Sequence, residues 1–180
     1  MNLRRRRGRA TGLAPARLFV LVLAVGFAAC GRTEAPPEPY TSLFPTKEAA
    51  AQAVVDALAA GDVARLEDLA ITAVEFRKNV WPELPAGRPD VGMPVEYVWA
   101  DTNTKSRGQL AENVREYRGK RATVQTLRFA GGTDDYGPFR VHKETHVVLR
   151  DEADTVRDAR LFGSMLESRA GWKVFSYIID

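Results

Sequence analysis

Apolar residues recur at intervals of three and four in the chain that follows Thr46. They run up to Gly61 in the order Ala49, Ala50, Ala53, Val54, Ala57 and Leu58. This period is that of an amphipathic helix; Thr is a good N-cap and Gly a common terminator. A second helix is predicted from Asp62 to Pro82. Its apolar face is Leu66, Leu69, Ala70, Ala73, Phe76 and Val80.

A third helix is predicted from Pro94 to about Tyr117, after a loop between Pro82 and Pro94 that is rich in proline and glycine. Its inward positions are Val95, Val98, Trp99, Leu110, Val114 and Tyr117. The middle of this helix, Asp101 to Gly108, is polar and poor in helix formers. A break there, with Ser106 capping a second half, is an alternative to one continuous helix.

The period changes to that of strands after Lys120. Four segments are rich in β-branched and aromatic residues: 123–129, 139–150, 155–167 and 172–179. The connections between them are short, which predicts an antiparallel meander. The sequence therefore predicts an α+β domain with three N-terminal helices packed on one curved, four-stranded antiparallel sheet. Both faces of the sheet carry apolar groups, so a second subunit is one way to cover the outer face.

This order of elements resembles the cone-shaped fold of the nuclear transport factor two superfamily. The resemblance covers Thr46 to Asp180 and rests on element order and on the alanine-rich helix pair with its Gly61–Asp62 corner. It implies a pocket between the helices and the concave sheet face, and dimers through the sheet. The superfamily holds ketosteroid isomerases, dehydratases and polyketide cyclases beside transport adaptors. The isomerases carry a tyrosine on the first helix, whereas this helix offers Ala, Val, Leu, Gln52 and Asp56 and has no tyrosine.

The segment before Thr46 predicts where the protein is located in the cell and not part of the folded domain. Leu18 to Ala29 is an apolar run of 12 residues behind a cluster of arginines. It fits the length of about 7–15 residues of a signal peptide and is shorter than the roughly 20 residues of a membrane span. Phe27-Ala28-Ala29-Cys30 resembles the lipobox of bacterial lipoproteins, in which the cysteine is lipidated. An ordinary secretory signal and a short membrane anchor are the alternatives.

This reading divides the chain into a signal peptide (1–29), a tether (30–45) that begins at the lipidated Cys30 and is rich in proline, and one domain (46–180). It predicts a bacterial envelope protein held on the periplasmic side. The absence of Asp after Cys30 resembles the signal for transport to the outer membrane. Cys30 is the only cysteine, so its lipidation leaves no thiol for a disulfide.

Removing the signal also reverses the net charge. The whole chain has 26 basic and 23 acidic residues, a net charge of +3. Six arginines precede Cys30 and every acidic residue follows it, so the mature part has 20 basic and 23 acidic residues, a net charge of −3. A nucleic-acid partner is therefore not expected.

Two histidines are the most distinctive candidates for chemistry. On one strand, His142, Glu144 and His146 would share a face, with the histidines about 13 Å apart. That separation is too large for one metal ion, so no metal site and no cofactor are predicted. General-base catalysis by His142 or His146, with Asp158 and Glu167 as further titratable candidates, stays open beside the interpretation as a polar, solvated face.

Two other groups are better explained by structure than by function. Asp134-Asp135-Tyr136-Gly137 has turn chemistry and lacks the further oxygen ligands of a calcium loop. Four aromatic residues fit a hydrophobic core better than a pocket mouth: Trp81, Tyr97, Trp99 and Phe139.

The sequence leaves two functions open. The first is a non-enzymatic domain that binds an apolar ligand or an envelope protein at the membrane surface. The second is a small isomerase-like or dehydratase-like enzyme. An enzyme needs a cavity with a titratable group at its floor, so His142, His146, Asp158 or Glu167 buried and unpaired in a cavity would favour the second.

Overall fold

The protein is described by a computed structural model that covers residues 40–179. The predicted signal, the predicted lipidation site Cys30 and residues 31–39 of the predicted tether lie outside these residues. None of the helices within residues 40–179 is long and apolar enough to cross a membrane.

The first predicted helix is confirmed with both of its ends. Helix α1 spans Lys47–Ala60. The Thr46 side chain accepts a hydrogen bond from the backbone N–H of Ala49, and Gly61 closes the helix in the left-handed region with φ of 70°. Asp62 then caps α2, Val63–Leu69, through the N–H of Arg65.

The single helix predicted from Asp62 to Pro82 is wrong, because α2 ends at Leu69. Ala70 is extended and forms a parallel bridge with Val174, and the N–H of Ile71 donates to the Val174 carbonyl (3.0 Å). A capping box between Thr72 and Glu75 then starts a new helix. The remaining short helices are α3 (Ala73–Glu75), η1 (Phe76–Val80), η2 (Trp81–Glu83) and η3 (Pro85–Gly87).

The third predicted helix is confirmed as one continuous element, α4, Val95–Tyr117, so the alternative with a break does not form. It is 23 residues long, yet only Leu110 and Asn113 on it are buried. The Asn113 side-chain amide donates to the Leu161 carbonyl (2.6 Å) and fixes the second half of the helix.

The strands confirm the α+β class but form two antiparallel sheets in place of one. The order is β1-β4-β5 in the first sheet and β2-β3-β6-β7 in the second. The strands are β1 (Ala122–Phe129), β2 (Thr133–Asp135), β3 (Phe139–Lys143), β4 (Thr145–Asp151), β5 (Val156–Ala159), β6 (Ser164–Ser168) and β7 (Gly171–Ser176).

The prediction of one four-stranded sheet fails because two predicted strands bend. The segment 139–150 is divided at Glu144, whose φ of 53° is left-handed, into β3 and β4. The segment 155–167 is divided between Ala159 and Ser164 into β5 and β6. Each long segment thus passes from one sheet to the other.

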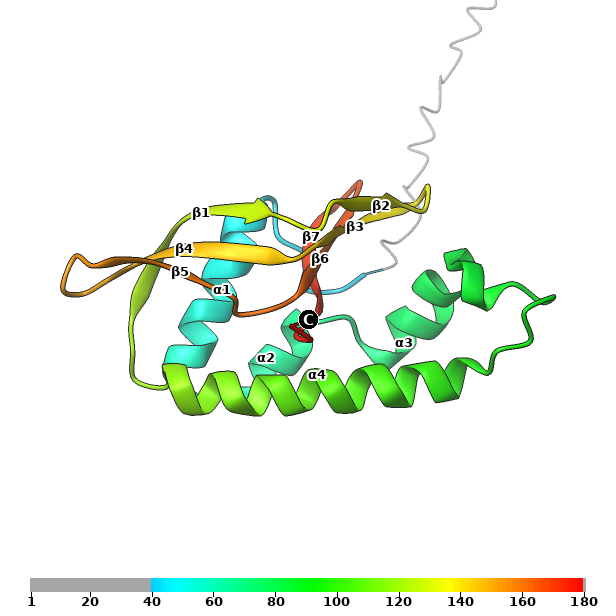
Figure 1. The fold of residues 1–180 in the computed structure, drawn as a ribbon, viewed down its shortest axis with the longest axis horizontal. Coiled ribbons are helices and arrows are strands. Elements are labelled where there is room, and N and C mark those ends of the chain that lie inside the picture. Colours follow the sequence, from blue (N-terminus) through cyan, green and yellow to red (C-terminus); the bar gives the residue numbers. More distant parts are fainter. Residues whose placement is uncertain (1–39, 180) are drawn as a thin grey trace, which may run out of the picture. The chain divides into compact units, whose positions relative to one another are not determined.

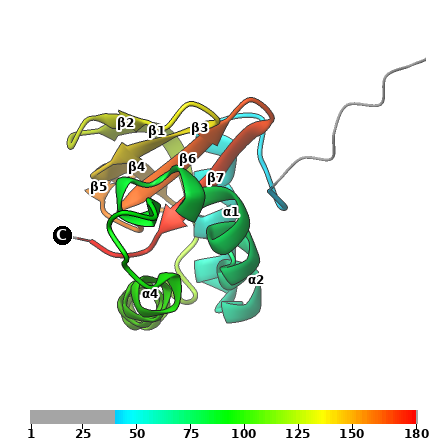
Figure 2. The same ribbon diagram turned by 90° about the vertical axis from the view of Figure 1, so that its right-hand side faces the viewer.

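The sheets form one layer, and the helices lie on one side of it (Figures 1 and 2). The larger core cluster lies between α1, α2 and the strands, around Leu58, Leu66 and Phe162. A second cluster surrounds Phe76, Phe139 and Leu166. On the outer face of β4, His146, Val148 and Arg150 are exposed or partly exposed, whereas Val147 and Leu149 are buried.

Gly163 offers a test of the bend between β5 and β6. A Cβ atom at this position would lie 1.7 Å from the carbonyl oxygen of Ile178. We expect Gly163→Ala to lower the free energy of unfolding by about 2–3 kcal/mol, because the backbone at residue 163 and the backbone at Ile178 must move apart. At Gly108, in α4, an added Cβ meets nothing within 4 Å. Gly108→Ala should therefore raise the free energy of unfolding by about 0.5–1 kcal/mol. Urea titrations compare the two; equal effects would contradict the bend.

Candidate ligand-binding cavity

A cavity of about 330 Å³ lies between α4, the linker from α2 to α3 and the end of β7. This volume is at the lower end of the roughly 300–1,000 Å³ usual for small-molecule sites. The apolar part of its wall is Ala70, Ile71, Ala73, Trp99, Leu110 and Phe175.

Helix α4 presents one face to this cavity, at spacings of three and four residues: Trp99, Thr102, Asn103, Ser106, Arg107 and Leu110. The polar stretch in the middle of the predicted helix therefore faces a cavity and does not break the helix. Within residues 40–179 no hydrogen bond involves the side chain of Thr102 or Asn103. The Ser106 hydroxyl accepts from the backbone N–H of Tyr177 (3.1 Å), so its own proton can still donate.

The opposite wall is made by the linker and by the residues that end β7. The Tyr177 hydroxyl donates to the Leu66 carbonyl (2.8 Å), and burial raises the pKa of Tyr177 well above its usual value. This tyrosine is therefore neutral at physiological pH. The Ser176 hydroxyl accepts from the N–H of Ile178 (3.0 Å).

Among residues 40–179, three charged side chains line this cavity, and all three are paired. Glu67 forms an ion pair with Arg107 (2.8 Å). Asp68 accepts hydrogen bonds from Ser42 (2.7 Å) and from Arg65. The cavity therefore offers neutral hydrogen-bonding groups and apolar surface, and no unpaired acid or base lines it.

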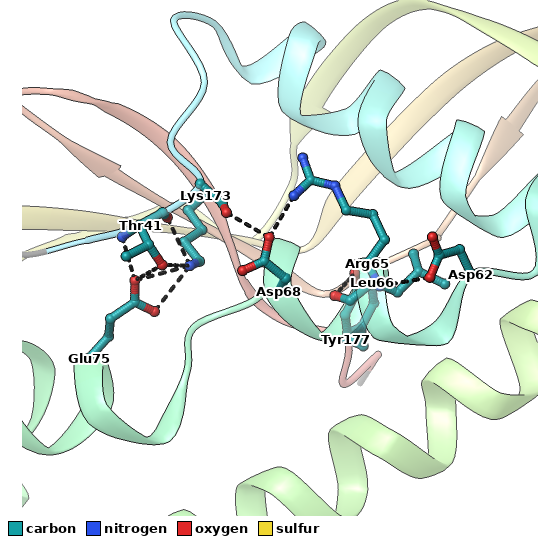
Figure 3. A network of polar contacts seen from close by, with 9 residues as sticks. Thr41, Asp62, Arg65, Leu66, Asp68, Glu75, Lys173 and Tyr177 are labelled. Atoms are coloured by element: carbon teal, nitrogen blue, oxygen red, sulfur yellow. Dashed lines mark hydrogen bonds and ion pairs between the residues drawn. The ribbon is translucent and has the colours of Figure 1, made fainter.

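A buried ion pair joins β7 to α3, next to the linker between α2 and α3 (Figure 3). Lys173 on β7 is fully buried, and its Nζ donates to both carboxylate oxygens of Glu75 on α3 (3.0 and 3.1 Å). The N–H of Thr72 donates to the same carboxylate (2.7 Å). Burial tends to raise the pKa of Glu75, but the N–H groups of Thr72 and Thr41 and the Lys173 ammonium outweigh it and lower the pKa below its ordinary value.

The segment before α1 completes this pair. The N–H of Thr41 donates to Glu75 (2.6 Å), and the Thr41 carbonyl accepts from Lys173 (2.9 Å). Tyr40 is buried, and Phe44 exchanges two backbone hydrogen bonds with Trp172 (2.9 and 2.8 Å). Residues 40–44 of the predicted tether are therefore packed against the domain.

The predicted candidate His142 is brought together with Glu167. Its Nε2 lies 2.9 Å from Glu167 Oε2, and its Nδ1 lies 2.9 Å from the hydroxyl of Thr133. The imidazole ring lies against Phe129 and Trp172, with centroid distances of 4.6 and 4.9 Å. Thr133, His142, Glu167 and Trp172 belong to the four strands of the second sheet, and Phe129 ends β1 of the first sheet. His142 therefore lies in a polar and aromatic cluster where the two sheets meet.

The candidates His146 and Asp158 are also brought together, on the first sheet. His146 Nδ1 lies 2.9 Å from Asp158 Oδ1. The Arg128 guanidinium (2.7 Å) and then His146 hold the pKa of Asp158 below its usual range. The expectation that both histidines share one strand face is wrong, because the bend at Glu144 places them in different sheets. None of the four candidates lines the cavity between α4 and the linker.

The other sequence candidates have structural contacts. The Asp135 side chain accepts from the N–H of Gly137 (2.8 Å), as in a turn. Phe139 is buried, and Trp81 and Trp99 pack on Phe76, but Tyr97 is 72% exposed. Within residues 40–179, no group of three or more His, Cys, Asp or Glu side chains could hold a metal ion.

No protein-family model, curated protein or solved structure matches the chain. Sequence reasoning missed the cavity, although Thr102, Asn103 and Ser106 fall on the inward face of a helix that is otherwise amphipathic. Polar residues at inward positions were the available signal.

The buried pair predicts a dependence of stability on pH. Glu75→Gln leaves the Lys173 charge without its counterion, so we expect a loss of about 3–5 kcal/mol in the free energy of unfolding at pH 7. Because the folded pKa of Glu75 is lowered, its contribution is present above the unfolded value of about 4.5 and is lost as pH falls through the folded pKa.

The difference between the parent and Glu75→Gln should therefore shrink below about pH 4.5, as measured by denaturant titration at several pH values. Asp154→Asn is the matched control, since this carboxylate is paired with Arg150 but 81% exposed. It should change the free energy of unfolding by less than about 1 kcal/mol. A difference for Glu75→Gln that is independent of pH would contradict the assignment.

Proposed function

We propose that this protein is a lipid-anchored protein of the bacterial envelope whose domain binds a small, uncharged and largely apolar molecule. The observation that carries this proposal is the pair Thr102 and Asn103. Both residues line a cavity with a large apolar wall, and neither side chain has a hydrogen-bond partner in residues 40–179, whereas the charged groups of the lining are all paired. Binding sites of this kind combine an apolar wall with a few polar groups that orient the ligand.

The chemistry of the wall supports binding over catalysis. General acid–base catalysis needs a titratable group within reach of the substrate. The ionisable groups that line the cavity are Glu67, Asp68, Arg107 and Tyr177, and each has a partner in the fold. An isomerase-like or dehydratase-like reaction would need another group there, and the four predicted candidates lie on the sheets.

The anchor part of the proposal rests on the sequence around Cys30. Membrane attachment through Cys30, with the outer membrane as the expected destination, would hold the cavity close to a lipid surface, where apolar molecules are concentrated. A homodimer through the sheet stays a prediction, and a second subunit would have to cover the polar face that carries His146 and Arg150.

Replacing the predicted lipidation site tests the anchor. In a bacterial host, Cys30→Ala should remove the hydrophobic mass that lipidation adds and should shift the protein out of the membrane fraction. Intact-mass spectrometry of the purified chains and fractionation of the cells measure both effects. If the parent and the variant have the same modification and the same membrane partitioning, the anchor is wrong.

Filling the cavity tests the binding site. We expect Thr102→Trp to weaken binding of the neutral fluorescent probe N-phenyl-1-naphthylamine at least about tenfold, or 1.4 kcal/mol, because the indole occupies the space of the ligand. Fluorescence titration of the chain from Tyr40 onward measures the affinity. Thr104→Trp is the matched control, since Thr104 is exposed on the same helix. Equal affinities of both variants and the parent would refute the site.

A further inference from the structure

A second, smaller chamber continues the line of the first along α4. It has a volume of about 280 Å³ and lies between α4 and the start of α2. Its wall is Val63, Glu67, Arg107, Leu110, Ala111 and Val114. Three of these residues, Glu67, Arg107 and Leu110, also line the first chamber, so the two chambers meet at this point.

The ion pair between Arg107 and Glu67 marks the place where the chambers meet. Leu110 is buried and forms the floor, with 3% of its surface exposed. The side chains of Arg107 and Glu67 are 63% and 43% exposed. Exposed pairs contribute only about 0–1 kcal/mol, so a ligand could displace this one at little cost.

The second chamber is apolar apart from this ion pair. Val63, which is 46% exposed, and the exposed Ala111 leave this chamber open to solvent on one side, whereas Leu110 is buried. The first chamber, in contrast, has its free polar groups at Thr102 and Asn103. Along α4 the lining is therefore neutral and polar at Thr102 and Asn103, before Arg107. After Arg107 it is aliphatic, at Leu110, Ala111 and Val114.

We propose that the two chambers together take a linear aliphatic chain with an uncharged polar head. The head lies at Thr102 and Asn103, and the chain passes between Leu110 and the Arg107–Glu67 pair to reach Ala111 and Val114. This inference rests on the proposed function and adds the class of ligand to it.

The dimensions agree with such a ligand. From Asn103 to Val114 the helix advances 11 residues, or about 16 Å at 1.5 Å per residue. A staggered chain of carbon–carbon bonds of about 1.5 Å covers about 14 Å with twelve carbons. A six-carbon chain from the same head position would end before Leu110. A compact ring system would fill the first chamber without contacting Val114.

Photolabelling locates the end of the chain directly. The probes are 1-alkanols of six and twelve carbons with a diazirine at the terminal carbon, added to the full-length protein in its membrane, and labelled residues are identified by peptide mass spectrometry. We expect the long probe to label Val63, Ala111 or Val114, and the short probe to label the wall of the first chamber. Unlabelled 1-dodecanol should compete with both.

A blocking variant adds a second readout. Ala111→Trp should lower labelling by the long probe at least about tenfold and leave labelling by the short probe unchanged. Glu112→Trp, at the neighbouring exposed position, is the matched control. Labelling of the first chamber alone by both probes would overturn the linear-chain inference and leave the proposed function intact. Labelling of neither chamber, or labelling that 1-dodecanol does not reduce, would overturn both.

Discussion

The buried ion pair between Lys173 and Glu75 is the constraint on which the rest of the domain depends. A buried charge is costly unless every donor and acceptor around it is satisfied. The Glu75 carboxylate has partners from three other places in the chain: Lys173 on β7, the linker at Thr72 and the segment at Thr41. The pair therefore fixes the positions of these segments together, and none of them can move without exposing a charge to an apolar core.

The position of the linker has a direct effect on the cavity. Ile71 is bonded to β7, and Thr72 caps α3, so this wall is rigid. Helix α4 forms the other wall, and its second half is held by the buried residues Leu110 and Asn113, whereas Trp99 in its first half packs on Phe76. A rigid wall that faces a helix with polar residues at its inward positions cannot close, because Thr102 and Asn103 would have to be buried without partners. The cavity follows from this mismatch.

Local signals predicted the helices well where capping and period agree. Thr46 and Gly61 bound α1 as expected, and α4 runs to Tyr117. The end of the second helix was predicted wrongly because its apolar period continues through Ala70. Thr72 and Glu75 form a capping box that starts a new helix, but the helix before it ends only because Ala70 pairs with Val174 on β7. The division into two sheets depends on the left-handed backbone of Glu144. Such a conformation is usually signalled by glycine, so the sequence did not indicate the bend.

The site could be predicted only in part, since its walls come from distant segments. Polar inward positions on α4 were visible, but the linker and the end of β7 were not placed against them. The pairing of His142 with Glu167 and of His146 with Asp158 depends on strand register, which the sequence left open.

If the chain is anchored through Cys30, a pulling force from the membrane reaches the domain close to Thr41. A force between the membrane and the domain would enter the fold at Tyr40 and would load the antiparallel hydrogen bonds between Phe44 and Trp172. The contacts nearest the tether are the packing of Tyr40 on Phe139 and, one residue further on, the hydrogen bonds of Thr41 with Glu75 and Lys173. A pull on the tether would thus remove Tyr40 from the second core cluster and partners from the buried charges before it reached the larger core cluster.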